Sequence, residues 1–295
     1  MKTTLKRRQY NQLGFWMLAP TAIILIVLTL YPIIYLSFMM FTEIELTGDG
    51  AITKFVGLSN FVRMVEDKTF FQSLGTTIIY VISSVSAEMV FGMLLALMVA
   101  NALKVPGVIK TLLMIPMLIA PVAVGLIWRL MYNPEFGLFN SILRGLGMPG
   151  LNWLADKNLA LLSIIISDIW QWTPFVYLIL LAGLQALPEE PFEAAKVDGA
   201  KAGQTFRYIT LPLLRPSILV ALLFRTMDAF KAYDKFVILT SGGPGNATQV
   251  VSLYNYKVSF TFWEMGYGAV LAFVTIMVVN IFNLIVFRGM ERLNS

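Results

Sequence analysis

The chain contains no cysteine and no histidine among its 295 residues. Without these side chains it has no disulfide framework, no thiolate nucleophile, no histidine general base and no zinc site of the His/Cys type. These absences exclude zinc-dependent and serine–histidine chemistry. We therefore expect neither catalytic residues nor metal ligands.

Charge is also scarce, at 13% of residues against about 25% in an ordinary soluble protein. Hydrophobic residues make up 58% of the chain. The 22 basic residues outnumber the 17 acidic ones, but no run of Lys and Arg with interleaved aromatics is present, so the basic excess predicts no nucleic-acid partner. The composition predicts a protein embedded in a lipid bilayer.

Six apolar stretches are long enough to cross a bilayer, which requires about 20 helical residues. No linker or clear internal repeat divides the chain. We predict an all-α, polytopic membrane protein in one domain (residues 1–295), with transmembrane helices at about 14–41, 73–100, 111–132, 159–184, 213–230 and 266–287. The charges inside these stretches are Glu88, Arg129, Asp168, Arg215, Arg225 and Asp228.

The basic cluster Lys6-Arg7-Arg8 before the first stretch is typical of a signal peptide. However, the stretch is too long for a signal-peptide core and no cleavage pattern follows promptly, so we predict a permanent span. Basic residues are more numerous on the N-terminal side of the predicted membrane. By the positive-inside rule, both termini are expected in the cytoplasm.

The segment between the fourth and fifth spans, at about residues 187–212, is too polar to cross the membrane. Pro188 and Pro191 with neighbouring glutamates suit a helix start. Gly199 can end that helix, and a second short helix is expected over residues 200–208, ended by Pro212. The prediction is a helical hairpin on the cytoplasmic face. The alternative, an amphipathic linker on the headgroups, would favour basic residues that are not in excess here.

This hairpin resembles the EAA loop of binding-protein-dependent ABC importer permeases. Glu193-Ala194-Ala195 is followed after three residues by Gly199, and after nine more by Ile209-x-Leu211-Pro212. Residues 30–32, 55–61 and 239–244 match the same family. Together they resemble its carbohydrate-uptake branch, and the Gly-Gly-Pro segment resembles the MalF-like subunit, the first of its two permease types.

The resemblance implies a type I ABC importer permease fold in a bacterial or archaeal cytoplasmic membrane. It also implies four kinds of partner: a second, MalG-like permease, two ATP-binding subunits, an extracytoplasmic solute-binding protein and a carbohydrate substrate. The chain has no Gly-x-x-x-x-Gly-Lys-Ser/Thr phosphate loop. It is therefore expected not to be an enzyme and to bind no cofactor, with ATP and Mg²⁺ held by the partner subunits.

Two sets of residues receive roles from the resemblance. The hairpin would dock in a cleft of an ATPase, and the residues that would couple ATP hydrolysis to transport are Glu193, Ala194, Ala195, Asp198 and Gly199. After the fifth span, a turn would help receive the binding protein through Gly242, Gly243 and Pro244.

A candidate solute site lies in the fourth span. Asp168, Gln171, Trp172 and Phe175 follow an i, i+3, i+4, i+7 pattern and share one helical face, with Asp168 roughly 13 Å from the helix start. A carboxylate and an amide can bind sugar hydroxyls, and the aromatic rings can stack on a sugar. In the sugar permeases that this chain resembles, the corresponding stretch lines the solute site.

Other roles for these charges remain open. Asp168 has a structural alternative, an ion pair with Arg129, Arg225 or a partner subunit. Arg225 and Asp228 either pair with each other or reach the solute cavity, and Glu88 is interpreted as a hydrogen-bonded structural carboxylate between helices.

The predicted function is carbohydrate import by alternating access as one subunit of an ATP-driven transporter. One alternative is a glycerol-phosphate-type permease, because Arg129 and Arg225 could face a phosphate. Two further classes are disfavoured. A self-contained secondary transporter or channel would often show an internal repeat, and an intramembrane enzyme would need a carboxylate dyad or other catalytic groups.

Overall fold

The computed structural model describes residues 2–47, 50–101 and 106–292. Two compact units are formed, one by Met1–Asp67 with Tyr256–Phe273 and the other by Lys68–Asn255 with Val274–Ser295. The first unit contains α1 (Lys2–Met39), β1 (Thr42–Thr47), β2 (Gly50–Phe55), α2 (Ser59–Glu66), η2 (Lys257–Thr261) and the start of α13 (Met265–Arg292).

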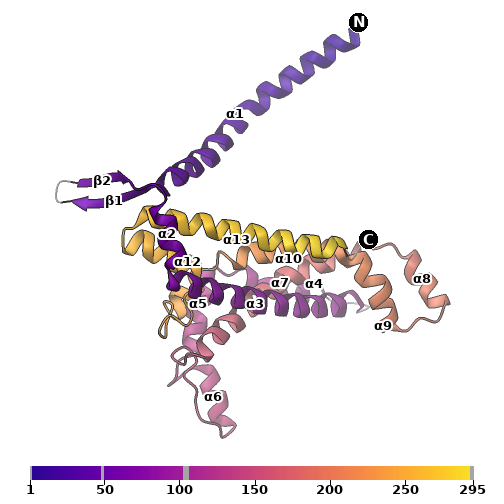
Figure 1. The fold of residues 1–295 in the computed structure, drawn as a ribbon. Helices are drawn as coiled ribbons and strands as arrows, with labels where there is room; N and C mark the ends of the chain where they lie inside the picture. Colours follow the sequence, from indigo (N-terminus) through magenta and orange to yellow (C-terminus); the bar gives the residue numbers. More distant parts are fainter. Residues whose placement is uncertain (1, 48–49, 102–105, 293–295) are drawn as a thin grey trace. The chain divides into compact units, whose positions relative to one another are not determined.

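The second unit holds most of the remaining helices (Figure 1). They are α3 (Lys68–Asn101), α4 (Gly107–Leu118), α5 (Pro121–Met131), α6 (Leu138–Gly145), α7 (Leu159–Gln185), α8 (Glu190–Val197), α9 (Ala202–Thr205), the π-helical turn η1 (Phe206–Thr210), α10 (Leu211–Ala229) and α11 (Asp234–Leu239). The short helix α12 (Val251–Tyr256) ends at the boundary between the two units.

The long helices coincide with the apolar stretches of the sequence. Within the described residues, five helical segments are long and apolar enough to cross a membrane, and a sixth is obtained if α4 and α5 are counted as one span. The five are the apolar part of α1, then α3, α7, the segment from α9 to α10, and α13. This arrangement confirms the all-α, polytopic class.

The third predicted span is not one continuous helix. The chain bends by 92° between α4 and α5, and Ile119 and Ala120 have extended ψ angles of 132° and 135°. Pro121 explains the break, because it has no N–H to continue the helical ladder and disfavours the α conformation in the preceding residue. The predicted span over 111–132 is therefore two helices that meet at a bend, because the prediction did not consider the effect of this proline.

The second hairpin helix was predicted to end at Pro212, but it does not end there. From Ala202 to Ala229 the chain is helical throughout, and η1 joins α9 to α10. The N–H of Leu211 donates to the carbonyl of Phe206, five residues back, so the π-helical turn changes the backbone register one residue before the proline. Pro212 then lies in the first turn of α10, where a missing N–H is tolerated.

A β-hairpin in the first unit was not predicted. β1 and β2 pair in antiparallel register from Thr42 opposite Phe55 to Thr47 opposite Gly50. The Asn60 side chain donates to the carbonyls of Met40 and Thr42 at 3.1 and 3.0 Å, which fixes the base of the hairpin. The connecting residues 48 and 49 lie outside the described part of the chain.

In the second unit, α3 and α7 run side by side, with α10 and α4 packed against α7 (Figure 1). Gly92 permits the approach of α3 to α7, because a Cβ atom there would lie only 2.6 Å from Cγ1 of Val176. Gly183 has the same role between α7 and α10, where a Cβ atom would lie 2.3 Å from the Ser217 hydroxyl. These contacts fix the spacing of α3, α7 and α10, the helices that carry Glu88, Asp168 and Arg225.

Candidate functional site

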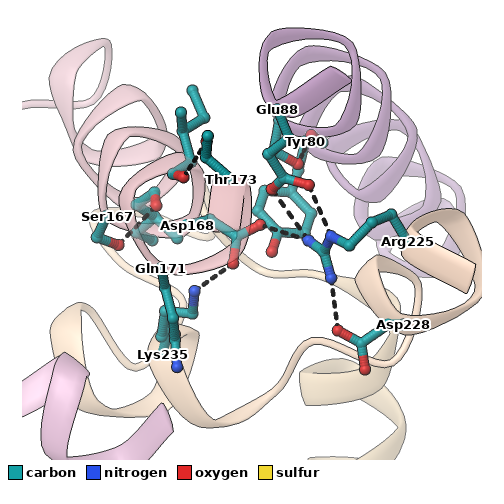
Figure 2. A network of polar contacts seen from close by, with 12 residues as sticks. Tyr80, Glu88, Ser167, Asp168, Gln171, Thr173, Arg225, Asp228 and Lys235 are labelled. Atoms are coloured by element: carbon teal, nitrogen blue, oxygen red, sulfur yellow. Dashed lines mark hydrogen bonds and ion pairs between the residues drawn. The ribbon is translucent and has the colours of Figure 1, made fainter. Parts of the chain in front are cut away.

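Arg225 of α10 lies at the centre of a buried ionic network in the second unit (Figure 2). Its Nε and Nη2 atoms donate to the two carboxylate oxygens of Glu88 in α3, at 2.6 and 3.0 Å. Nη2 also donates to Oδ2 of Asp168 in α7 at 3.2 Å, and Nη1 donates to Oδ2 of Asp228 at 2.6 Å. The guanidinium group therefore links three helices.

A second cation completes the network from α11. The Lys235 ammonium group donates to Oδ1 of Asp168, so each oxygen of this carboxylate accepts from a different cation (Figure 2). The side chains of Glu88, Asp168, Arg225 and Lys235 are at most 5% exposed. Two carboxylates thus balance two cations. Balance matters because removing one partner of a buried ion pair typically destabilises a protein by about 3–5 kcal/mol.

One edge of the network is open. The Asp228 side chain is 52% exposed, and Trp172 and Phe175 are half-buried on α7. The Arg225 guanidinium carbon lies 4.8 Å from the centre of the Trp172 ring, a cation–π contact. The rings of Trp172 and Phe175 meet edge to face at 6.2 Å. This edge offers a carboxylate beside two aromatic rings, a combination suited to a polyhydroxylated ligand.

Gln171 is fully buried and has a structural contact. Its Nε2 donates to the carbonyl of Ile119 at 2.9 Å, at the break between α4 and α5. Its Oε1 has no hydrogen-bond partner among the described residues. The structure therefore brings Asp168, Trp172 and Asp228 each into contact with Arg225. The amide of Gln171 is instead directed to the helix break.

The predicted coupling residues lie on α8 and at its C-terminal end. Glu193 and Ala194 are exposed on α8, whereas Ala195 is buried. Gly199 has φ = +71°, the left-handed conformation that ends many helices. The two arms of the hairpin, α8 on one side and α9 with η1 on the other, enclose an open pocket of about 490 Å³. It is lined by Pro191, Ala194, Ala195, Asp198, Gly199, Ala200, Gln204, Thr205, Tyr208 and Ile209.

The predicted outer turn follows α11 and is held by two threonines. Thr240 accepts from the N–H of Gly242 at 3.3 Å, and Thr248 donates to the carbonyl of Gly243 at 2.7 Å. Gly242 is buried, while Gly243 and Pro244 are half-buried. The exposed residues at this turn are Ser241, Gly245 and Asn246.

Comparison with known proteins identifies the family. Residues 69–295 match the family described as "Binding-protein-dependent transport system inner membrane component". This chain belongs to that family. The permease subunit predicted from the EAA-like residues is thereby confirmed.

Relatives of the permease match it over most of their length. It is 37% identical to the trehalose/maltose transport system permease protein MalF of Thermococcus litoralis, over 97% of this chain and 95% of the relative. It is 31% identical to the lactose transport system permease protein LacF of Rhizobium radiobacter, over 95% of each chain.

A solved structure shares the fold of the permease. A chain from the crystal structure of a bacterial alginate ABC transporter, in complex with an alginate pentasaccharide-bound periplasmic protein, superposes with a TM-score of 0.85. The match covers 98% of both chains at 22% identity. This likeness confirms the type I importer permease fold expected from the sequence.

Sequence reasoning did not find Lys235 as a member of the network. Glu88 was interpreted as a hydrogen-bonded structural carboxylate between helices, and its contacts agree with that interpretation, but its partner Arg225 was not named. Arg129 was considered as a partner of Asp168, but it instead donates to the carbonyl of Ile238 at 3.3 Å. An electrostatic argument could have indicated Lys235. Charged side chains at membrane depth usually pair with one another, so Glu88 and Asp168 required a second cation besides Arg225.

Proposed function

We propose that this permease subunit imports a carbohydrate and contacts it at the open edge of the buried network. The observation that carries the proposal is the grouping of Trp172, Phe175 and the half-exposed Asp228 beside the buried ions. Aromatic rings can cover the apolar face of a sugar, and a carboxylate can accept from its hydroxyls. The relatives named for trehalose, maltose and lactose transport support the same class of solute.

Asp168 has a supporting role in this proposal. It is 1% exposed, and its oxygens hold Arg225 and Lys235. The carboxylate keeps Arg225 beneath Trp172 and thereby shapes the surface that the solute meets. Gln171 supports the same helix face through its contact at the helix break.

The permease would work with a second permease, two ATP-binding subunits and an external solute-binding protein. Its hairpin would receive motion from an ATPase through Glu193, Ala194, Ala195, Asp198 and Gly199, and the transmembrane helices would alternate between inward-facing and outward-facing arrangements. The permease itself would bind no ATP, metal or other cofactor. The outer turn at Gly242, Gly243 and Pro244 would face the binding protein, with both chain termini in the cytoplasm of a bacterial or archaeal cell.

Uptake of radiolabelled trehalose, maltose and lactose by cells that depend on this transporter tests the proposal. Trp172→Ala should reduce uptake of the transported sugar at least about tenfold, equivalent to about 1.4 kcal/mol. The matched control is Trp170→Ala, because Trp170 packs against Trp128 rather than Arg225. Equal uptake by the two variants, at equal amounts of assembled transporter, would contradict the proposed site.

A further inference from the structure

Arg225 has little capacity left to bind an anionic solute. A guanidinium group carries five N–H donors in a fixed plane. Four hydrogen bonds engage Arg225, two with Glu88, one with Asp168 and one with Asp228. A phosphate or carboxylate ligand would therefore find at most one donor, although arginine normally binds such groups with two.

Charge around the open edge also opposes an anion. The four buried groups, Glu88, Asp168, Arg225 and Lys235, are balanced, so the network offers no net positive charge. The group next to solvent is the carboxylate of Asp228. An approaching anion would meet a like charge first and a saturated cation behind it.

We infer that Glu88 is a positioning residue that restricts this site to uncharged solutes by occupying one full edge of the Arg225 guanidinium. The inference rests on the proposed solute site and narrows its substrate class to neutral carbohydrates and polyols. Glu88 does not contact the solute; it is fully buried on α3 and acts through Arg225. Replacing Glu88 by glutamine removes the carboxylate that accepts from two donors of Arg225. The buried groups Asp168, Arg225 and Lys235 are then left with one excess positive charge.

The decisive experiment measures ligand binding to the full transporter in lipid nanodiscs. Saturation-transfer NMR detects the bound ligand, and the solute-binding protein is omitted. The probes are trehalose, as a neutral disaccharide, and glucose 6-phosphate, as an anionic sugar. The wild type should bind trehalose, and glucose 6-phosphate should not displace it. In Glu88→Gln, glucose 6-phosphate should displace trehalose at a concentration at least tenfold below the highest one that leaves trehalose bound to the wild type.

Three variants separate this effect from a general loss of structure. Lys235→Met also disrupts the network but leaves it with an excess negative charge, so it should still exclude glucose 6-phosphate. Glu88→Asp retains the carboxylate and should also exclude it. The double variant Glu88→Gln/Arg225→Gln should lose the affinity for glucose 6-phosphate that Glu88→Gln gains, because the anion is expected to bind Arg225.

Each result decides a separate question. If the wild type binds trehalose but Glu88→Gln gains no affinity for glucose 6-phosphate, the role of Glu88 is wrong and the solute site stands. If the Trp172→Ala variant binds trehalose as tightly as the wild type does, the proposed site itself is wrong. Should Glu88→Gln fail to assemble, Asp168→Asn provides the test, since it also frees a donor of Arg225 and must show the same gain.

Discussion

Substitution of Gly92 by alanine should separate α3 from α7 and destabilise the permease. An added Cβ atom would lie 2.6 and 2.8 Å from Cγ1 and Cβ of Val176, and 3.0 Å from the backbone nitrogen of Tyr177. The Val176 atoms nearest to the new methyl belong to a branched side chain with one preferred rotamer in a helix, and the third neighbour is backbone. The helices must therefore move apart.

Overpacking of this kind typically costs about 1–3 kcal/mol. This corresponds to a decrease of about 5-fold to 150-fold in the ratio of folded to unfolded protein. Gly75→Ala is the matched control, because Gly75 lies in the same helix and its Cβ atom would meet no atom within 4 Å. Both substitutions carry the gain in helix propensity of about 1 kcal/mol, so the difference between them reports the contact alone.

Equilibrium unfolding in mixed detergent micelles, followed by tryptophan fluorescence, provides the assay. Gly92→Ala should be less stable than Gly75→Ala by the amount above. Adding Val176→Ala to Gly92→Ala should recover part of the loss, a non-additivity expected only for residues in contact. Equal stability of the two single variants would refute the close approach of α3 and α7 at this position.

The remaining predictions concern the hairpin, the outer turn and helix α6. Gly199→Ala should uncouple ATP hydrolysis from transport in reconstituted transporter, because alanine is strained at φ = +71° by about 1–2 kcal/mol. Replacing Gly242-Gly243-Pro244 with three alanines should reduce binding-protein-stimulated ATPase activity; an unchanged activity would contradict that contact. Asn140→Ala should lower the thermal midpoint, since its amide makes four hydrogen bonds with Pro134, Leu151 and Trp153.

The fold class could be predicted from the sequence because it depends on long apolar stretches, which local composition reveals. Features that depend on a single residue, or on pairing between distant segments, were harder to predict. The break at Pro121 was readable, because the proline itself carries the signal. The β-hairpin at Thr42–Thr47 and Gly50–Phe55 depends on cross-strand pairing and on Asn60, so the polar loop composition alone did not indicate it.

The site was predictable only along single helices. The i, i+4 relation placed Asp168 and Trp172 on one face of α7, and both contact Arg225. The i, i+3 relation paired Arg225 with Asp228. Contacts between helices have no such periodic signal. Glu88 is separated from Arg225 by 137 positions and Lys235 from Asp168 by 67. The Glu88–Arg225 and Lys235–Asp168 ion pairs were therefore found only in three dimensions.

The connectivity of the chain links this network to the hairpin formed by α8 and α9. The hairpin joins the C-terminal end of α7 to the start of α10, and these helices carry Asp168 and Arg225. Along α10, Arg225 lies about 21 Å from Leu211 at 1.5 Å per residue. No flexible linker intervenes, since η1 continues α9 directly into α10. A displacement of the hairpin should therefore change the position of α7 relative to α10. The Asp168–Arg225 contact is the longest of the Arg225 hydrogen bonds, at 3.2 Å, and is where we expect that change to reach the proposed solute site.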